Sequence, residues 1–129
     1  MGRKLIAVVT AGIAVASLSV PSFGHHGTSI VYDLTDSITI SGVVTDFQFV
    51  NPHTLIHFDV TENGEVVGWL AGLSANTSLA RAEGWTRDIL EPGDEITVIG
   101  APARGGAPSV WVQQVLLNGE PLLEGEYTG

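Results

Sequence analysis

The chain has 129 residues, the length of one domain, with fourteen acidic residues, five basic residues and no cysteine. The lack of cysteine excludes disulfides, thiolate metal sites and cysteine nucleophiles. A formal charge of −9 disfavours phosphate backbones and anionic membranes, which need Lys and Arg for neutralisation. We therefore expect no nucleic-acid partner, and a metal ion or a basic protein suits the charge better.

The first 24 residues have the features of a secretory signal peptide. Arg3 and Lys4 are followed by an uncharged apolar stretch over residues 5–20, which is shorter than the about 20 residues of a membrane span. Small residues then allow cleavage after Gly24, or alternatively after Ser22. We expect a periplasmic or secreted protein without stable membrane insertion, whose three arginines and fourteen acids give a formal charge of −11.

The segment after the signal is predicted to be an arm followed by a long strand. Residues 25–37 have no hydrophobic period and are assigned to an N-terminal arm. Residues 38–50 alternate between apolar and polar side chains, which predicts a strand. The apolar positions change face after Gly42, which predicts a bulge or sharp bend at this glycine. Asn51 and Pro52 predict a turn at the strand's end.

Residues 54–60 predict a second strand whose two faces differ in polarity. Asn63-Gly64 predicts a tight hairpin into a third strand over residues 66–71. The faces of the second strand carry Ile56, Phe58 and Val60 on the core side, and Leu55, His57 and Asp59 on the other.

A helix is predicted over residues 74–83, because Ser74 can cap its start and Gly84 can end it. Strands are predicted over residues 95–100 and 109–117, on either side of a loop rich in Gly and Pro.

The resulting order, β-β-β-α-β-β, is that of the OB-fold, a five-stranded and partly open barrel. The barrel domain is assigned to residues 38–123 and a C-terminal tail to residues 124–129. A lipocalin-like barrel or a simple sandwich is the alternative. Trp69, Trp85 and Trp111 are predicted to fill the barrel or cover the helix rather than to stack against a ligand.

A series of short motifs runs through the chain: His25-His26-Gly27, Tyr32-Asp33, Gly42-Val43-Val44, Asn51-Pro52-His53, Gly84-Trp85-Thr86-Arg87 and Pro92-Gly93-Asp94. This series resembles a family of small exported bacterial proteins of unknown function. Gly27 stands where that family usually has Ser. The resemblance implies export, with a Gram-negative periplasm as the expected location, and it implies no reaction.

The four histidines, His25, His26, His53 and His57, suggest a metal site. After cleavage at Gly24, the α-amine and imidazole of His25 could chelate copper, or less readily zinc, with His26 and His53 completing the site. On one strand His53 and His57 would lie about 13 Å apart, too far for both to bind one ion. His57 and Asp59 could therefore only contact the residues that bind the metal, without binding it themselves. The arm would also have to fold back to reach His53.

Three functions follow from these observations. The first is an exported, non-enzymatic protein that binds copper or zinc through His25, His26 and His53. The second is a metal-free protein-interaction or structural module, in which the histidines are incidental and Asn51-Pro52-His53 is turn chemistry, with the Asn51 side chain bonded to its own backbone. The third and least favoured is a copper-dependent oxidative enzyme, and no catalytic residues are assigned.

Overall fold

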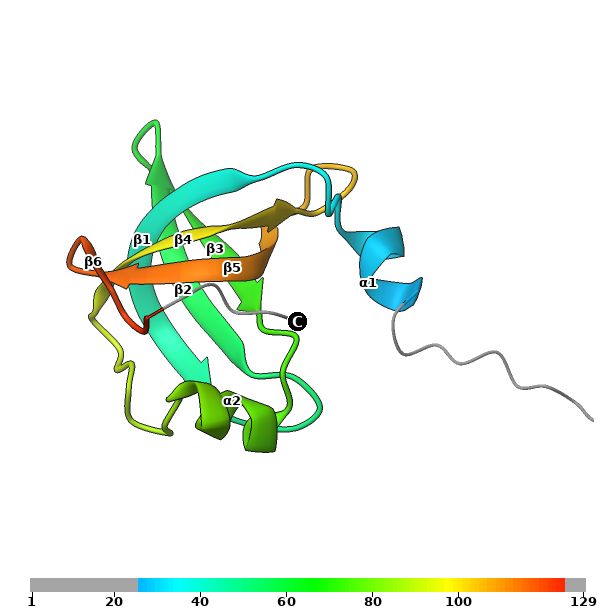
Figure 1. The fold of residues 1–129 in the computed structure, drawn as a ribbon. Coiled ribbons are helices and arrows are strands. Elements are labelled where there is room, and N and C mark those ends of the chain that lie inside the picture. Colours follow the sequence, from blue (N-terminus) through cyan, green and yellow to red (C-terminus); the bar gives the residue numbers. More distant parts are fainter. Residues whose placement is uncertain (1–25, 125–129) are drawn as a thin grey trace, which may run out of the picture.

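One sheet of six strands closes on itself into a barrel in the computed structural model, which describes residues 26–124 (Figure 1). The strand order is β3-β2-β1-β4-β5-β6, and a parallel pairing of β3 with β5 completes the barrel. The elements are α1 His26–Val31, β1 Ile38–Gln48, β2 Leu55–Glu62, β3 Glu65–Gly72, α2 Thr77–Glu83, β4 Glu95–Pro102, β5 Ser109–Leu117 and β6 Glu120–Pro121. With α2 between β3 and β4, this arrangement confirms the predicted OB-like fold.

The long strand β1 changes face at a bulge, but not at the predicted glycine. Its pairing with β2 shifts between Val44 and Asp46, so Thr45 is the extra residue of the bulge. Beyond Thr45, the alternation of core-facing and outward-facing positions is shifted by one residue. Gly42 has another role. A Cβ at this position would collide with the backbone oxygen of Asp59 and lie 2.8 Å from the ring of Phe58, so only glycine allows β1 and β2 to approach so closely.

The second strand and its hairpin follow the sequence prediction. Ile56, Phe58 and Val60 are buried on the core side of β2. Asn63 and Gly64 have φ values of 51° and 80°, as a two-residue hairpin turn requires. The period of two and the turn chemistry therefore determine the structure of this hairpin locally.

Helix α2 is shorter than predicted and has a different N-cap. The side chain of Asn76, not Ser74, accepts hydrogen bonds from the amides of Ser78 and Leu79 at 3.1 and 3.0 Å. Gly84 ends the helix in a left-handed conformation with φ 105°, as predicted. The helix lies across one end of the barrel (Figure 1), where Ala80 is fully buried.

The core fills the barrel and extends beneath α2. Trp85 is fully buried there, and its ring centroid lies 6.0 Å from that of Phe47. The fully buried members with the largest side chains are Trp85, Phe58, Ile56, Leu73, Val44, Val98, Val110 and Val115. No helix within residues 26–124 is long and apolar enough to cross a membrane.

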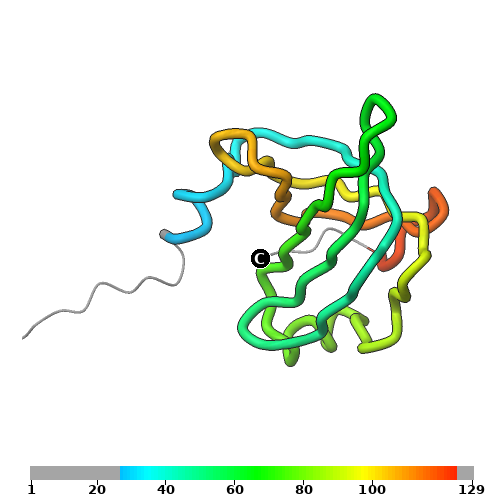
Figure 2. The backbone as a smooth tube through the Cα atoms, turned by 180° about the vertical axis from the view of Figure 1, so that it is seen from behind, coloured from blue at the N-terminus to red at the C-terminus, as the bar shows by residue number. Residues whose placement is uncertain are grey.

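The predicted arm contains a short helix, α1, which lies beside the loop between β4 and β5 (Figure 2). Tyr32 directly follows α1 and forms a bridge with Ala103 in that loop. The predicted signal peptide and His25 lie outside the described residues.

Candidate functional site

Three aromatic rings from distant parts of the chain meet on the outside of the barrel. The ring centroid of Trp111 lies 5.4 Å from that of Tyr32, with an interplanar angle of 37°. It lies 5.5 Å from the ring centroid of His53, which meets Trp111 edge-on at 79°. Both geometries are favourable for aromatic pairs. We call Tyr32, His53 and Trp111 the aromatic cluster.

Trp111 lies on the outer face because of its place in β5. Its neighbours Val110 and Val112 are buried in the core, so the alternation of the strand turns the side chain of Trp111 outward. The residue paired with it in β3 is Gly72, and a Cβ there would lie only 3.1 Å from the indole ring. The ring therefore packs over bare backbone, next to Leu55 in β2.

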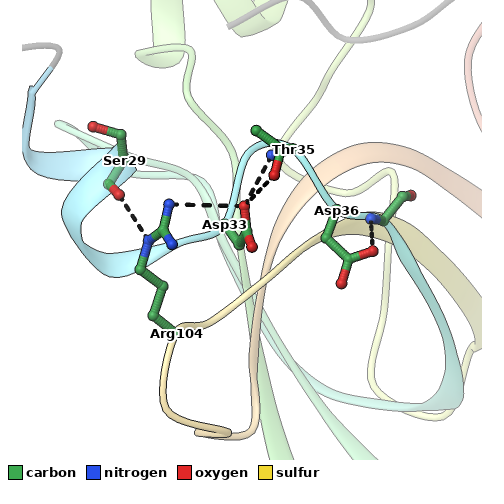
Figure 3. A network of polar contacts seen from close by, with 6 residues as sticks. Ser29, Asp33, Thr35, Asp36 and Arg104 are labelled. Carbon is green, nitrogen blue, oxygen red and sulfur yellow. Dashed lines mark hydrogen bonds and ion pairs between the residues drawn. The ribbon is translucent and has the colours of Figure 1, made fainter.

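Tyr32 reaches the cluster because its segment is fastened to the β4–β5 loop. The Tyr32 hydroxyl lies 2.6 Å from the Ser109 hydroxyl, and the backbone amide of Arg104 donates to the Val31 carbonyl at 2.8 Å. Arg104 Nε also donates to the Ser29 carbonyl at 3.0 Å (Figure 3). These contacts hold α1 and Tyr32 against the barrel.

Asp33 completes this attachment. Its carboxylate lies 3.7 Å from Arg104 and accepts hydrogen bonds from the Thr35 hydroxyl and amide at 2.7 and 3.1 Å (Figure 3). The Thr35 hydroxyl, then the Thr35 amide, and to a lesser extent the charge of Arg104, lower the pKa of Asp33. The charged form of Asp33 is therefore the one that the arm favours.

His53 is positioned by the loop between β1 and β2. Asn51 Oδ1 accepts hydrogen bonds from both the amide and the hydroxyl of Thr77, each at 3.0 Å, which ties this loop to the start of α2. Thr54, the residue after His53, is fully buried, and its carbonyl accepts from the Leu73 amide at 3.0 Å. The suggestion that the Asn51 side chain bonds to its own backbone is therefore wrong, because its side-chain oxygen accepts hydrogen bonds from Thr77 at the start of α2 instead.

Of the three residues assigned to the metal site, the structure describes the side chain of His53 alone. His53 is exposed and contacts Trp111, while His57 lies farther along β2, opposite Asp46 and Leu70. Among the side chains that the structure describes, no group of three His, Cys, Asp or Glu could hold one ion. Since His25 and the side chain of His26 lie outside the part of the chain that the structure describes, the predicted metal site stays a prediction.

The tryptophans divide between the predicted role and an unforeseen one. Trp85 is fully buried, and Trp69 packs with its ring centroid 6.4 Å from that of Phe58, so both contribute to the core as predicted. Trp111 instead lies outside, and neither its contact with Tyr32 nor that with His53 was predicted. The signal available in the sequence was the alternation of the strand: Trp111 lies between Val110 and Val112 and must face the side opposite to both.

Several solved structures share the barrel. Two crystal forms of the mitochondrial single-stranded DNA binding protein Rim1 from S. cerevisiae are 10% and 12% identical to the chain, each with a TM-score of 0.47. They cover 64% of this chain, and 92% and 91% of their own. The structure of yeast Stn1 and Ten1 is 13% identical, with a TM-score of 0.41, and covers 63% of this chain and 42% of its own. These likenesses concern the fold alone.

These neighbours correct one expectation. The exclusion of nucleic acid as a partner is contradicted, because Rim1 is by name a single-stranded DNA binding protein. The physical weakness of the exclusion is that a net charge is a sum over the whole chain. It does not describe the potential at any one place on the barrel.

No curated protein is significantly similar to the chain. A family model, however, matches residues 12–110, which include the barrel through the start of β5 as well as the aromatic cluster residues Tyr32 and His53. The chain therefore belongs to DUF6152, a family of unknown function.

Proposed function

We propose that this protein is a non-catalytic interaction module that binds a protein partner on the aromatic cluster. The observation that carries this proposal is the outward position of Trp111, half-buried between His53 of the β1–β2 loop and Tyr32, which is bridged to Ala103 of the β4–β5 loop. OB-folds bind their ligands on the face of strands 2 and 3 and with these two loops. Tyr and Trp are also enriched among the residues that dominate protein–protein binding energies.

The charge distribution favours a basic partner. The described residues include thirteen acidic side chains and three arginines. Two of the arginines have intramolecular partners: Arg104 contacts Asp33 and Ser29, and Arg81 lies with its guanidinium 5.3 Å from the centroid of the Phe49 ring. The excess of negative charge, summed over the domain, would steer a partner that carries Lys and Arg toward it and would speed association at low salt.

The test is site-specific photo-cross-linking in the native host. A photoreactive amino acid replaces His53, which is exposed at the edge of the cluster, and in a matched control replaces Leu79, which is 59% exposed on α2. We expect a discrete adduct with a basic protein from position 53 and none from position 79. An adduct with nucleic acid would show that the partner is nucleic acid and not a protein, and would overturn the proposal. Identical adducts from both positions, or no adduct from either, would also overturn it.

A second candidate function is the binding of copper by the histidines. Its support is that Tyr32 and His53 contact the same Trp111 ring, so the arm already lies beside His53. His26 begins the helix that ends just before Tyr32, about 9 Å of helical rise away. This proximity supports the candidate, because Tyr32 at the end of the arm and His53 already contact one ring.

The test of this candidate is titration of Cu(II) into the processed chain, beside His25→Ala, His53→Ala and a chain with one extra N-terminal residue. One-to-one, sub-micromolar binding that all three changes weaken would support the site. Weak binding that ignores them would reject it, and the interaction module would be unaffected.

We also propose that the chain is exported and cleaved after Gly24, on the basis of residues 1–24. Intact-mass measurement of the protein from the cell envelope tests this directly, because a mature chain that begins at His25 differs in mass from one that begins at Phe23. Recovery of the full-length chain would reject cleavage.

A further inference from the structure

One edge of β3 has no strand beside it over most of its length. The pairing of β3 with β2 runs along the whole strand, whereas its pairing with β5 is confined to residues 70–72. Among the residues that the structure describes, residues 65–69 therefore have a strand on one side only. They belong to the β2–β3 hairpin, whose tip rises above the rest of the barrel in Figure 2. We call the free side of residues 65–69 the open edge.

The geometry of the hairpin determines which backbone groups the open edge offers. The turn at residues 63–64 has two residues, so the residues that flank it form a hydrogen-bonded pair. Backbone groups of alternate residues along β3 then face β2, while those of Val66, Gly68 and Leu70 face away from it. The Leu70 amide accordingly donates to the Pro108 carbonyl at 3.1 Å on that side. The N–H and C=O groups of Val66 and Gly68 are thus presented along the open edge.

The open edge lacks the features that usually prevent a strand from pairing with another chain. Edge strands of soluble proteins are commonly protected by Lys or Pro, by a bulge, or by being very short. β3 has eight residues without Lys or Pro, and its register with β2 has no shift. Val66 is 64% exposed, and Gly68 is exposed as bare backbone. Another strand can therefore approach both residues.

The surroundings of the open edge determine which side chains such a strand should carry. A carboxylate oxygen of Asp59 in β2 would lie 4.0 Å from a Cβ at Gly68, so this carboxylate leans toward the bare glycine. A Lys or Arg opposite Gly68 would meet no intervening side chain on its way to Asp59. Val66 lies on the same face, two residues earlier, and favours an apolar neighbour. Asp59 and Glu65 would repel a second copy of the same edge, which carries the same acids.

We propose that the open edge binds an extended segment of a partner protein as an additional antiparallel strand, with Lys or Arg opposite Gly68 and a β-branched apolar residue opposite Val66. In this mode of recognition, main-chain hydrogen bonds give affinity and alternate side chains give specificity. Two paired residues on each strand form about four such bonds, and antiparallel pairing is the more stable form. This surface is distinct from the aromatic cluster, and the inference does not depend on what the cluster binds.

The test is titration of a synthetic Thr-rich peptide with Lys-Thr-Val at its centre into the ¹⁵N-labelled chain. Hydrogen exchange measured by NMR reads the open edge directly, because the amides of Val66 and Gly68 should exchange freely in the chain alone and become protected as the peptide saturates. The same peptide with N-methyl groups on its Lys and Val amides should protect neither, because it cannot donate to β3. A peptide with Glu in place of Lys should bind more weakly.

Variants with matched controls attribute the binding to this edge. Gly68→Pro removes an amide that faces away from β2, as edge strands tolerate, and it should abolish protection at Val66. Val66→Lys tests the edge without a change of backbone and should weaken binding by repulsion, whereas Leu79→Lys adds the same charge on α2 and should not. Asp59→Asn should raise the Kd about two- to fivefold, and Asp88→Asn, at an exposed position outside β2 and β3, should leave it unchanged.

Four outcomes would overturn the proposal. They are equal protection by the N-methylated peptide, binding that survives both edge variants, saturable shifts that leave the two edge amides unprotected, and no saturable binding. Protection that appears in the chain alone as its concentration rises would identify a second copy as the occupant, which would also overturn it. Cross-linking at position 53 is read independently, so failure of the open edge is distinguishable from failure of the aromatic cluster.

Discussion

Truncation of Trp111 to Ala should loosen the N-terminal segment as well as destabilise the barrel. Truncation of a buried Trp costs about 3–5 kcal/mol, and because Trp111 is only half-buried we expect a loss of about 2 kcal/mol in the free energy of unfolding. The lost ring pair with Tyr32 accounts for about 0.5–1.5 kcal/mol of that loss. That part should act on the arm, because Tyr32 joins the arm to the barrel.

Two measurements separate these effects. Urea unfolding gives the global loss. Hydrogen exchange at the Tyr32 amide, which donates to the Thr28 carbonyl at 2.8 Å, reports local opening of the arm and should become about two- to tenfold faster. Leu79→Ala, which removes an exposed apolar side chain from α2, should change neither quantity appreciably. If arm exchange in Trp111→Ala matches that control, then the aromatic cluster does not hold the arm.

Three further predictions concern the same region. Gly72→Ala should cost about 1 kcal/mol in urea unfolding and shift tryptophan fluorescence, because the new Cβ would lie 3.1 Å from the Trp111 ring; unchanged fluorescence would show that the ring does not lie over this glycine. Asn51→Ala should cost about 1–2 kcal/mol through the two bonds from Thr77, whereas Asn51→Asp retains the acceptor and should be nearly neutral in the same assay. The lowered pKa of Asp33 means that its contribution to stability is fully present above the ordinary carboxyl pKa of 3.8 and is lost as the pH falls through the lower value of the folded state. Melting temperatures measured across that acid range should therefore decline less steeply in Asp33→Asn, and an identical decline would contradict the assignment.

Local chemistry in the sequence determined much of the fold. The alternation of Ile56, Phe58 and Val60 fixed the core face of β2, and Asn63-Gly64 fixed the hairpin. These predictions succeeded because a period of two and a left-handed turn are properties of a few consecutive residues. The order of elements then limited the barrel to few topologies, and the OB-like arrangement was among them.

The bulge in β1 and the cap of α2 depended on contacts that short segments do not reveal. Thr45 is the extra residue just beyond the point where the pairing of β1 with β4 ends, at Val43, while its pairing with β2 continues. Gly42 is required in β1 for a different reason, because Asp59 and Phe58 of β2 approach its backbone too closely for a side chain. At the helix, Asn76 and Ser74 are both capping residue types, and the helix begins at Thr77, which is bonded to Asn51 of the distant β1–β2 loop.

The candidate site was decided by the tertiary structure alone. Tyr32, His53 and Trp111 are separated by up to 79 positions in the chain and meet only because β3 pairs with β5 and the arm binds the β4–β5 loop. The sequence could assign the side-chain types and, for Trp111, the facing within its own strand. Which distant residues share a surface depends on strand pairing across the closed barrel, because that pairing brings together segments that no local pattern relates.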